Sequence, residues 1–233
     1  MVRGGAVPPT PPFTIRMLPG NVAYVALNSF GDSKAADAYI AAFPQIAKSS
    51  ALIIDVRNNG GGTSDEGYRV LATLTGKPFA TDKWSTRQYL PTFRAWQRKM
   101  PDYSDVGFWP SDAAHQYAKP VRVLTSASTF SSAEDFAAAY ATMKRGALVG
   151  ETTGGSTGQP LIIRLPGGGS ARICTKRDTY SDGRPWVGIG IVPGVPAAPR
   201  IADFRNGKDA VLEAALASLK YGGGPPKSNP ADR

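Results

Sequence analysis

Residues that build metal centres and disulfides are scarce in this sequence. Its 233 residues include one cysteine, Cys174, and one histidine, His115. A single cysteine excludes a disulfide within the chain, and one cysteine with one histidine, without a CxxC or HExxH motif, argues against a zinc site. No apolar stretch approaches the roughly 20 residues that cross a membrane as a helix. We therefore expect no metal, no cofactor and no membrane span.

Acidic residues are outnumbered, but the excess positive charge is spread along the chain. Lysine and arginine number 27 against 18 aspartate and glutamate residues, which gives a net charge of +9. No dense basic run and no nucleic-acid-binding motif accompanies this charge, so binding to nucleic acid is not expected. The opening stretch, MVRGGAVPPTPPF, lacks the apolar segment of a signal peptide.

Strands, glycine-rich loops and helices alternate along the chain, which predicts an α/β fold. The apolar runs at 51–56, 121–126 and 147–150 are typical of strands buried in a parallel sheet. Two further strands are expected at 13–18 and 21–30, joined by a turn at Pro19 and Gly20, and a hairpin is expected to turn at 166–169. Apolar residues at helical spacing predict helices that begin near residues 32, 63, 132 and 208.

Three regions depart from this alternation. Residues 1–12 are rich in proline and glycine and predict a flexible N-terminal segment, and residues 221–233 predict a disordered tail. Residues 77–119 carry Trp84, Trp96 and Trp109, with a strand expected within 83–93 and a short helix over 93–100. Aromatic clusters commonly line a core or a binding site, and we interpret this region as an aromatic-rich insertion in a core that spans 13–220.

Three of the predicted strands end in loops rich in glycine and polar residues, at 57–62, 126–132 and 151–159. The ends of parallel strands gather at one edge of a sheet and form a crevice there. Ser131 and Ser132 lie at a predicted helix start, where the helix dipole favours negative charge, and the N–H groups of Gly61 or Gly62 supply further donors. This pattern is typical of an acyl-transfer site. On the local pattern alone, however, a capping box between Ser131 and Glu134 is favoured.

Seven segments in one order extend this interpretation. They are AYVALNSF, LIIDVRNNGGG, VLTSASTFSSAEDFA, ALVGETTGG, LPGGGS, GIGIVP and GKDAVLEAAL. Together they resemble the S41 serine peptidases, which include the C-terminal processing (tail-specific) peptidases, the tricorn core and interphotoreceptor retinoid-binding protein. The resemblance extends from about residue 13 to residue 220. It implies a ClpP/crotonase-like superhelical α/β core.

The resemblance also assigns roles to individual residues. It implies that Ser131 is the nucleophile and that the backbone N–H groups of Ser132 and of Gly61, or Gly62, form the oxyanion hole. Glu134 is then expected to cap the same helix.

No general base carries over in the same way. The lysine of the tail-specific peptidases falls on Ser156, and the histidine of the tricorn type falls on Ala26. A hydroxyl such as that of Ser156 relays a proton but is no base. His115 and Lys176 remain as candidates, although a surface histidine and a solvated strand lysine fit their surroundings better.

The resemblance favours a serine endopeptidase of S41 type that acts on peptides or unfolded proteins, with a non-standard or missing base. The alternative is a catalytically impaired protein of the same fold that binds peptides or lipophilic small molecules. A crotonase-like acyl-thioester enzyme is a third interpretation, and the serine at the helix start disfavours it. Bacterial members of the family are often extracytoplasmic, which favours that location here. The sequence leaves the oligomeric state open.

Overall fold

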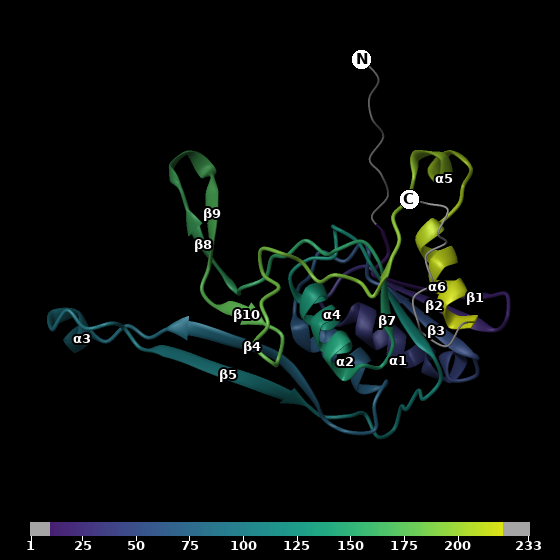
Figure 1. Cartoon of the computed structure of the whole chain (residues 1–233), viewed down its shortest axis with the longest axis horizontal. Coiled ribbons are helices and arrows are strands. Elements are labelled where there is room, and N and C mark those ends of the chain that lie inside the picture. Colours follow the sequence, from purple (N-terminus) through teal and green to yellow (C-terminus); the bar gives the residue numbers. More distant parts are fainter. Residues whose placement is uncertain (1–9, 221–233) are drawn as a thin grey trace, which may run out of the picture.

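A six-stranded, mainly parallel sheet forms the centre of the protein in the computed structural model, which describes residues 10–220 (Figure 1). The strand order is β1-β2-β3-β6-β7-β11, and only β1 runs antiparallel to its neighbour. The strands are β1 (Phe13–Leu18), β2 (Val22–Leu27), β3 (Ala51–Asp55), β6 (Val121–Thr125), β7 (Ala147–Gly150) and β11 (Val195–Pro196). The predicted mixed α/β class and the β1–β2 turn at Pro19 and Gly20 are confirmed.

Helices cover both faces of this sheet. Helices α1 (Lys34–Ile46), α2 (Ser64–Ala72) and α4 (Ser132–Met143) pack on one face, and α6 (Ala210–Lys220) packs on the other. Alternate residues of each strand therefore enter different cores: Leu52 and Ile54 lie under α1, α2 and α4, whereas Ile53 lies under α6. Burial on both faces explains why residues 51–54 of β3 are all apolar.

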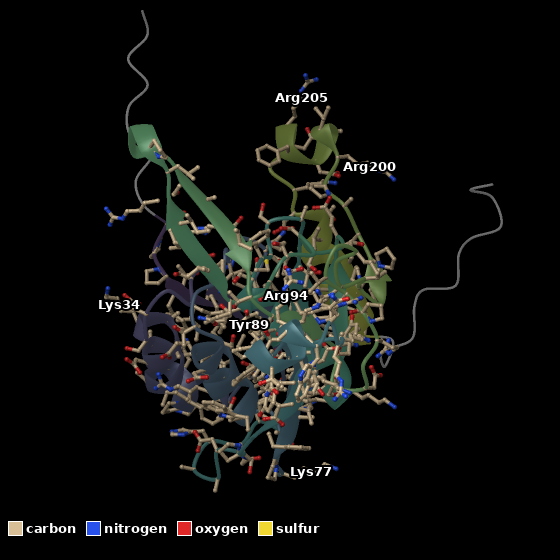
Figure 2. All side chains as sticks on the ribbon, turned by 90° about the vertical axis from the view of Figure 1, so that its left-hand side faces the viewer. Lys34, Lys77, Tyr89, Arg94, Arg200 and Arg205 are labelled. Atoms are coloured by element: carbon tan, nitrogen blue, oxygen red, sulfur yellow. The ribbon has the colours of Figure 1, made fainter. Side chains whose placement is uncertain are left out.

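Smaller elements extend away from the sheet. Strands β4 (Phe79–Arg87), β5 (Asp102–Trp109) and β10 (Arg177–Thr179) form an antiparallel sheet, and helix α3 (Pro91–Ala95) lies at the far end of the β4–β5 ribbon (Figure 1). Strands β8 (Pro160–Arg164) and β9 (Ser170–Cys174) form the predicted hairpin, which turns through a 3₁₀ segment, Pro166–Gly168. Helix α5 (Ile201–Arg205) lies away from the body of the protein, with Arg200 directly before it and Arg205 at its end (Figure 2).

The middle of the chain differs in part from the sequence prediction. The helix expected over 93–100 lies instead at Pro91–Ala95, and residues 102–109 form strand β5, which was not predicted. Pairing with β4 stabilises β5, and the rings of Trp84 and Tyr103 pack across the two strands with centroids 5.2 Å apart. Residues 1–9 of the expected flexible N-terminal segment and the whole expected tail, 221–233, lie outside the described residues.

Within residues 10–220, no helix is both long and apolar enough to cross a bilayer.

Candidate active site

Two loops from neighbouring strands are fastened together at the carboxyl edge of the central sheet. Ser126, which follows β6, donates its hydroxyl to the carbonyl of Arg57, which follows β3, with an oxygen–oxygen distance of 2.7 Å. The N–H of Phe130 donates to the carbonyl of Asn59 at 3.0 Å. The loop that carries Ser131 therefore lies directly against the glycine-rich loop 57–62.

A third loop, which follows β7, completes this edge. The N–H of Gly154 donates to the carbonyl of Thr129 at 3.0 Å, and the N–H of Ser131 donates to the carbonyl of Ser156 at 2.9 Å. The structure thus brings together the three strand ends that were expected to converge. Ser156, where the sequence resemblance places the family lysine, contacts Ser131 through its backbone.

Glycine is required in the first loop because the backbone approaches its neighbours so closely. A Cβ atom on Gly61 would lie 2.6 Å from the Cβ of Ser131 and 3.0 Å from the nitrogen of Ser132. A Cβ atom on Gly62 would lie 2.0 Å from the carbonyl oxygen of Phe30. Both glycines also have positive φ angles, +98° and +140°, which residues with a side chain rarely adopt.

Ser131 has a strained backbone at the start of α4. Its φ of 55° and ψ of −128° are unusual for a residue with a side chain. Its carbonyl accepts the N–H groups of Glu134 at 2.7 Å and of Asp135 at 3.2 Å, which, together with the bond to Ser156, fixes this conformation. Such strain costs about 1–3 kcal/mol and is concentrated at functional sites.

Glu134 is a buried carboxylate that joins the helix to the third loop. One oxygen, Oε1, accepts the hydroxyl of Thr153 at 2.5 Å and the N–H of Gly155 at 2.6 Å. The other, Oε2, accepts the N–H of Ser156 at 2.8 Å and of Ser131 at 3.3 Å. The expected capping role is therefore one part of a larger one, which sequence reasoning missed because three of the donors lie about 20 residues away.

The backbone donors around Ser131 are only partly engaged. In the described part of the chain, the N–H groups of Ser132 and Gly62 donate to no protein group. The N–H of Gly61 donates to the Oδ1 of Asn59 at 2.9 Å, and the buried Asn59 amide donates to the carbonyl of Leu27 at 3.0 Å. Asn59 is thus a second residue that the sequence did not single out, since its side chain is what orients the glycine loop.

His115 lies at the other edge of the sheet. Its Nδ1 is 2.7 Å from the Oδ2 of Asp112, and its ring packs on Phe43 with centroids 5.1 Å apart. Asp112 donates its N–H to the carbonyl of Ala72, the last residue of α2. The first residue of α2 follows Gly62 by two positions, so His115 and the glycine loop lie at opposite ends of this helix. A helix of this length spans about 13 Å. His115 is therefore not retained as the base for Ser131.

Lys176 is engaged in a buried cluster of carboxylates. Its Nζ lies 2.5 Å from the Oδ1 of Asp178 and 3.6 Å from the Oδ2 of Asp82. Burial alone would lower the pKa of Lys176. The hydrogen bond and charge of Asp178 and the charge of Asp82 outweigh burial and raise the pKa above its ordinary value, so the ammonium stays protonated. Lys176 is for this reason a poor general base.

Asp135, on α4, adds to the same cluster. Burial, followed by the charge of Asp82, raises the pKa of Asp135 to about 8, although a hydrogen bond from Ser64 at 2.6 Å opposes the shift. The protonated form is thus favoured near neutral pH because a charged carboxylate is poorly solvated there.

In the described residues, no ionisable side chain is placed to act as a base for Ser131. Among residues 10–220, no lysine, histidine or carboxylate is hydrogen-bonded to the Oγ of Ser131, and no group of three or more metal-ligating side chains is placed to hold an ion. The arrangement can orient a hydroxyl and stabilise an adjacent negative charge, but it does not itself remove the hydroxyl proton.

The fold and the site define a mixed α/β protein whose strand-end loops bring a strained serine against glycine backbone. Residues 21–197 match the family model for Peptidase family S41. The chain belongs to Peptidase family S41, which confirms the resemblance seen in the sequence.

Relatives of known sequence and structure agree with this membership. The chain is 28% identical over 182 residues to the chloroplastic C-terminal processing peptidase of Tetradesmus obliquus, an alignment that covers 77% of this chain and 36% of the relative. A Parabacteroides merdae protein of known crystal structure shares the fold with a TM-score of 0.76 and 22% identity, over 89% of this chain and 64% of the other. The photosystem II D1 C-terminal processing protease gives a TM-score of 0.61 and 24% identity, over 93% of this chain and 54% of the other. The chain thus spans about a third of the curated relative.

Proposed function

We propose that the protein is a serine peptidase of S41 type in which Ser131 is the nucleophile. The observation that carries this proposal is the strained Ser131 backbone, held in direct contact with Gly61 beside an unengaged N–H of Ser132. Family membership supports a peptide or an unfolded protein as the substrate. The ClpP/crotonase-like description of the core and an extracytoplasmic location are parts of the same proposal.

The geometry supports an acyl transfer. As its proton leaves, the Oγ of Ser131 attacks the carbonyl carbon of the substrate, and the carbonyl oxygen becomes an oxyanion. The carbonyl then re-forms, the C–N bond breaks, and the amine leaves with a proton from water; a second water hydrolyses the acyl-serine ester. The N–H of Ser132 is the first donor to that oxygen, and its position in the first turn of α4 adds the favourable field of the helix dipole. The second donor is an N–H of the glycine loop: that of Gly62 is unengaged, and that of Gly61 must exchange Asn59 Oδ1 for the oxyanion.

The missing base determines how fast this reaction runs. Ser156 replaces the family lysine, and a neutral hydroxyl is too weak a base to accept the proton of Ser131 near neutral pH. We therefore expect acylation of Ser131 to be slow at pH 7 and to accelerate at alkaline pH, where hydroxide takes the proton. A large increase in rate on replacing Ser156→Lys would indicate that the loop still holds the lysine position of the active family.

A fluorophosphonate probe tests the assignment of the nucleophile. We expect the wild-type protein to be labelled covalently, Ser131→Ala to lose the label, and Ser128→Ala, an exposed serine in the same loop, to keep it. Peptide mass analysis should place the adduct on residue 131. Absence of labelling up to pH 9, or labelling that survives in Ser131→Ala, would refute the proposal; ligand binding without turnover would then favour a binding protein.

A further inference from the structure

A basic hollow lies at the edge of the sheet opposite Ser131. It occupies about 530 Å³ between the amino ends of β6 and β7, the end of α4 and the end of α6. Its lining residues are Pro120, Arg122, Ala141, Lys144, Arg145, Gly146, Ala147 and Leu219. The volume is in the range of small-molecule sites, and three of its eight lining residues are cations while none is acidic.

The two arginines are held by neutral groups. Arg122, which is 5% exposed, donates to the hydroxyl and carbonyl of Ser218 at 2.8 Å each and to the carbonyl of Val121 at 2.9 Å. Arg145 donates only to backbone carbonyls, including that of Leu74 at 2.9 Å. Within residues 10–220, no carboxylate lies within 4.0 Å of Arg122, Arg145 or Lys144.

A buried cation without a counter-ion is unfavourable, because burial removes its hydration. Burial accordingly lowers the pKa of Arg122. An anion in the hollow would balance these charges.

The two arginines, one buried and one half-buried, also have N–H groups that bond to no described protein group. A guanidinium carries five N–H groups, and the three bonds of Arg122 leave two of them. The Nη1 of Arg145 donates to no described protein group. Together with the ammonium of Lys144, these donors suit the oxygens of a phosphate or a carboxylate.

An apolar hollow of about 500 Å³ borders the basic one and shares Pro120 and Leu219 with it. Most of its other lining residues are apolar or glycine: Pro19, Gly20, Val22, Ala51 and Leu216. Ser50 and Lys220 are the polar exceptions. Alkyl chains gain free energy in such surroundings because apolar surface leaves water.

We propose that these two hollows form a binding site for an anionic amphiphile, with a phosphate or carboxylate head at Arg122, Lys144 and Arg145 and an alkyl chain in the apolar hollow. The site is separate from Ser131 and does not depend on the proposed peptidase activity. The hollow adjoins the amino ends of β6 and β7, whereas Ser131 follows the carboxyl end of β6, and strands of four and five residues span about 13–16 Å.

Calorimetric titration with octyl phosphate tests the proposal. Inorganic phosphate and octanol serve as the head and the tail alone, and we expect octyl phosphate to bind much more tightly than either. Butyl, hexyl and octyl phosphate should show affinities that rise roughly threefold to fourfold per added methylene. Ser131→Ala should bind octyl phosphate like the wild type.

Lys144→Asn is the diagnostic variant, because Lys144 has a φ of 53° and asparagine tolerates that conformation. We expect it to weaken octyl phosphate binding about tenfold, the effect of one charge-assisted hydrogen bond. Lys34→Asn, an exposed lysine paired with Asp32, removes the same charge elsewhere and should change affinity less than about twofold. Thermal unfolding confirms that both variants are folded.

Three results would overturn the proposal: no saturable binding of octyl phosphate below about 1 mM, equal affinities in Lys144→Asn and Lys34→Asn, or equal affinities for octyl phosphate and inorganic phosphate. Vesicles of phosphatidylcholine with phosphatidic acid distinguish a free amphiphile from a membrane lipid. Binding to such vesicles without binding of free octyl phosphate would indicate a surface charge effect and would also overturn it.

Discussion

Replacement of Glu134→Gln tests whether this buried carboxylate holds the candidate site together. Gln keeps the size of the side chain, and its amide oxygen retains two of the four accepted hydrogen bonds. Its amide nitrogen, however, faces the N–H groups of Ser156 and Ser131, which are donors themselves. Ser131 keeps its bond to the Ser156 carbonyl, so one backbone donor, that of Ser156, loses its partner outright.

The structure allows the loss to be estimated. A hydrogen bond to a charged group contributes about 1.5–3 kcal/mol, and an unpaired donor costs about 1–3 kcal/mol. We expect the free energy of unfolding to fall by about 2–4 kcal/mol, which lowers Tm by roughly 5–15 °C in a chain of this size. The rate of fluorophosphonate labelling should fall at least tenfold, because the Ser131 conformation is no longer fixed.

Denaturant unfolding and timed labelling measure the two effects. Glu213→Gln, an exposed glutamate of α6, is the matched control and should alter stability by less than about 0.5 kcal/mol. A Glu134→Gln protein with the Tm and labelling rate of the control would refute the argument that this carboxylate fixes the loop.

Three further perturbations follow from the same structure. Gly61→Ala should destabilise the protein by more than about 2 kcal/mol and abolish labelling, because its Cβ would overlap Ser131; Gly183→Ala, with a φ of +87° but no atom within 4 Å, isolates the cost of the backbone angle, and equal losses in both would contradict the overlap. Arg57→Ala should lower the free energy of unfolding by about 3 kcal/mol in a denaturant titration, because it leaves the buried Asp55 without its ion pair and frees Asp209 at the start of α6, whereas Arg184→Ala at an exposed pair should change little. Asp135 holds a proton in the folded state up to pH of about 8 but releases it near pH 3.8 when unfolded, so its contribution lowers stability as pH rises through that range. Asp135→Asn should flatten the dependence of unfolding free energy on pH between 5 and 8, and an unchanged slope would show that the carboxyl is ionised.

The sequence predicted the parts of the fold that depend on local pattern. The runs ALIID, VRVLT and ALVG are almost entirely buried, and burial on both faces of the sheet accounts for their mostly apolar composition. Asp55 and Arg122 are the charged exceptions. Strand β5 was missed because most of its residues are exposed and its first half, DYSD, carries no strand pattern, so its stability comes from pairing with β4 rather than from its own composition.

Only those residues of the candidate site that belong to a recognisable local motif could be predicted from the sequence. Gly61 and Ser131 stand out within their own segments, and the structure places them in contact. The local pattern predicted that Glu134 caps its helix, but its bonds to Thr153, Gly155 and Ser156 depend on another segment. The bond from Asn59 to Leu27 likewise joins segments that are distant in the sequence. His115 was considered because it is the only histidine, and composition alone says nothing about which edge of the sheet a residue occupies.

The dependence of Ser131 on residues 153–156 has a consequence for the newly made chain. During synthesis the serine leaves the ribosome before the segment that sets its backbone angle, and β7 must join the sheet before that segment is in place. An incomplete or partly unfolded chain therefore lacks the assembled crevice. If Ser131 is the nucleophile proposed above, this order of events keeps it without its oxyanion-hole loop until folding is finished.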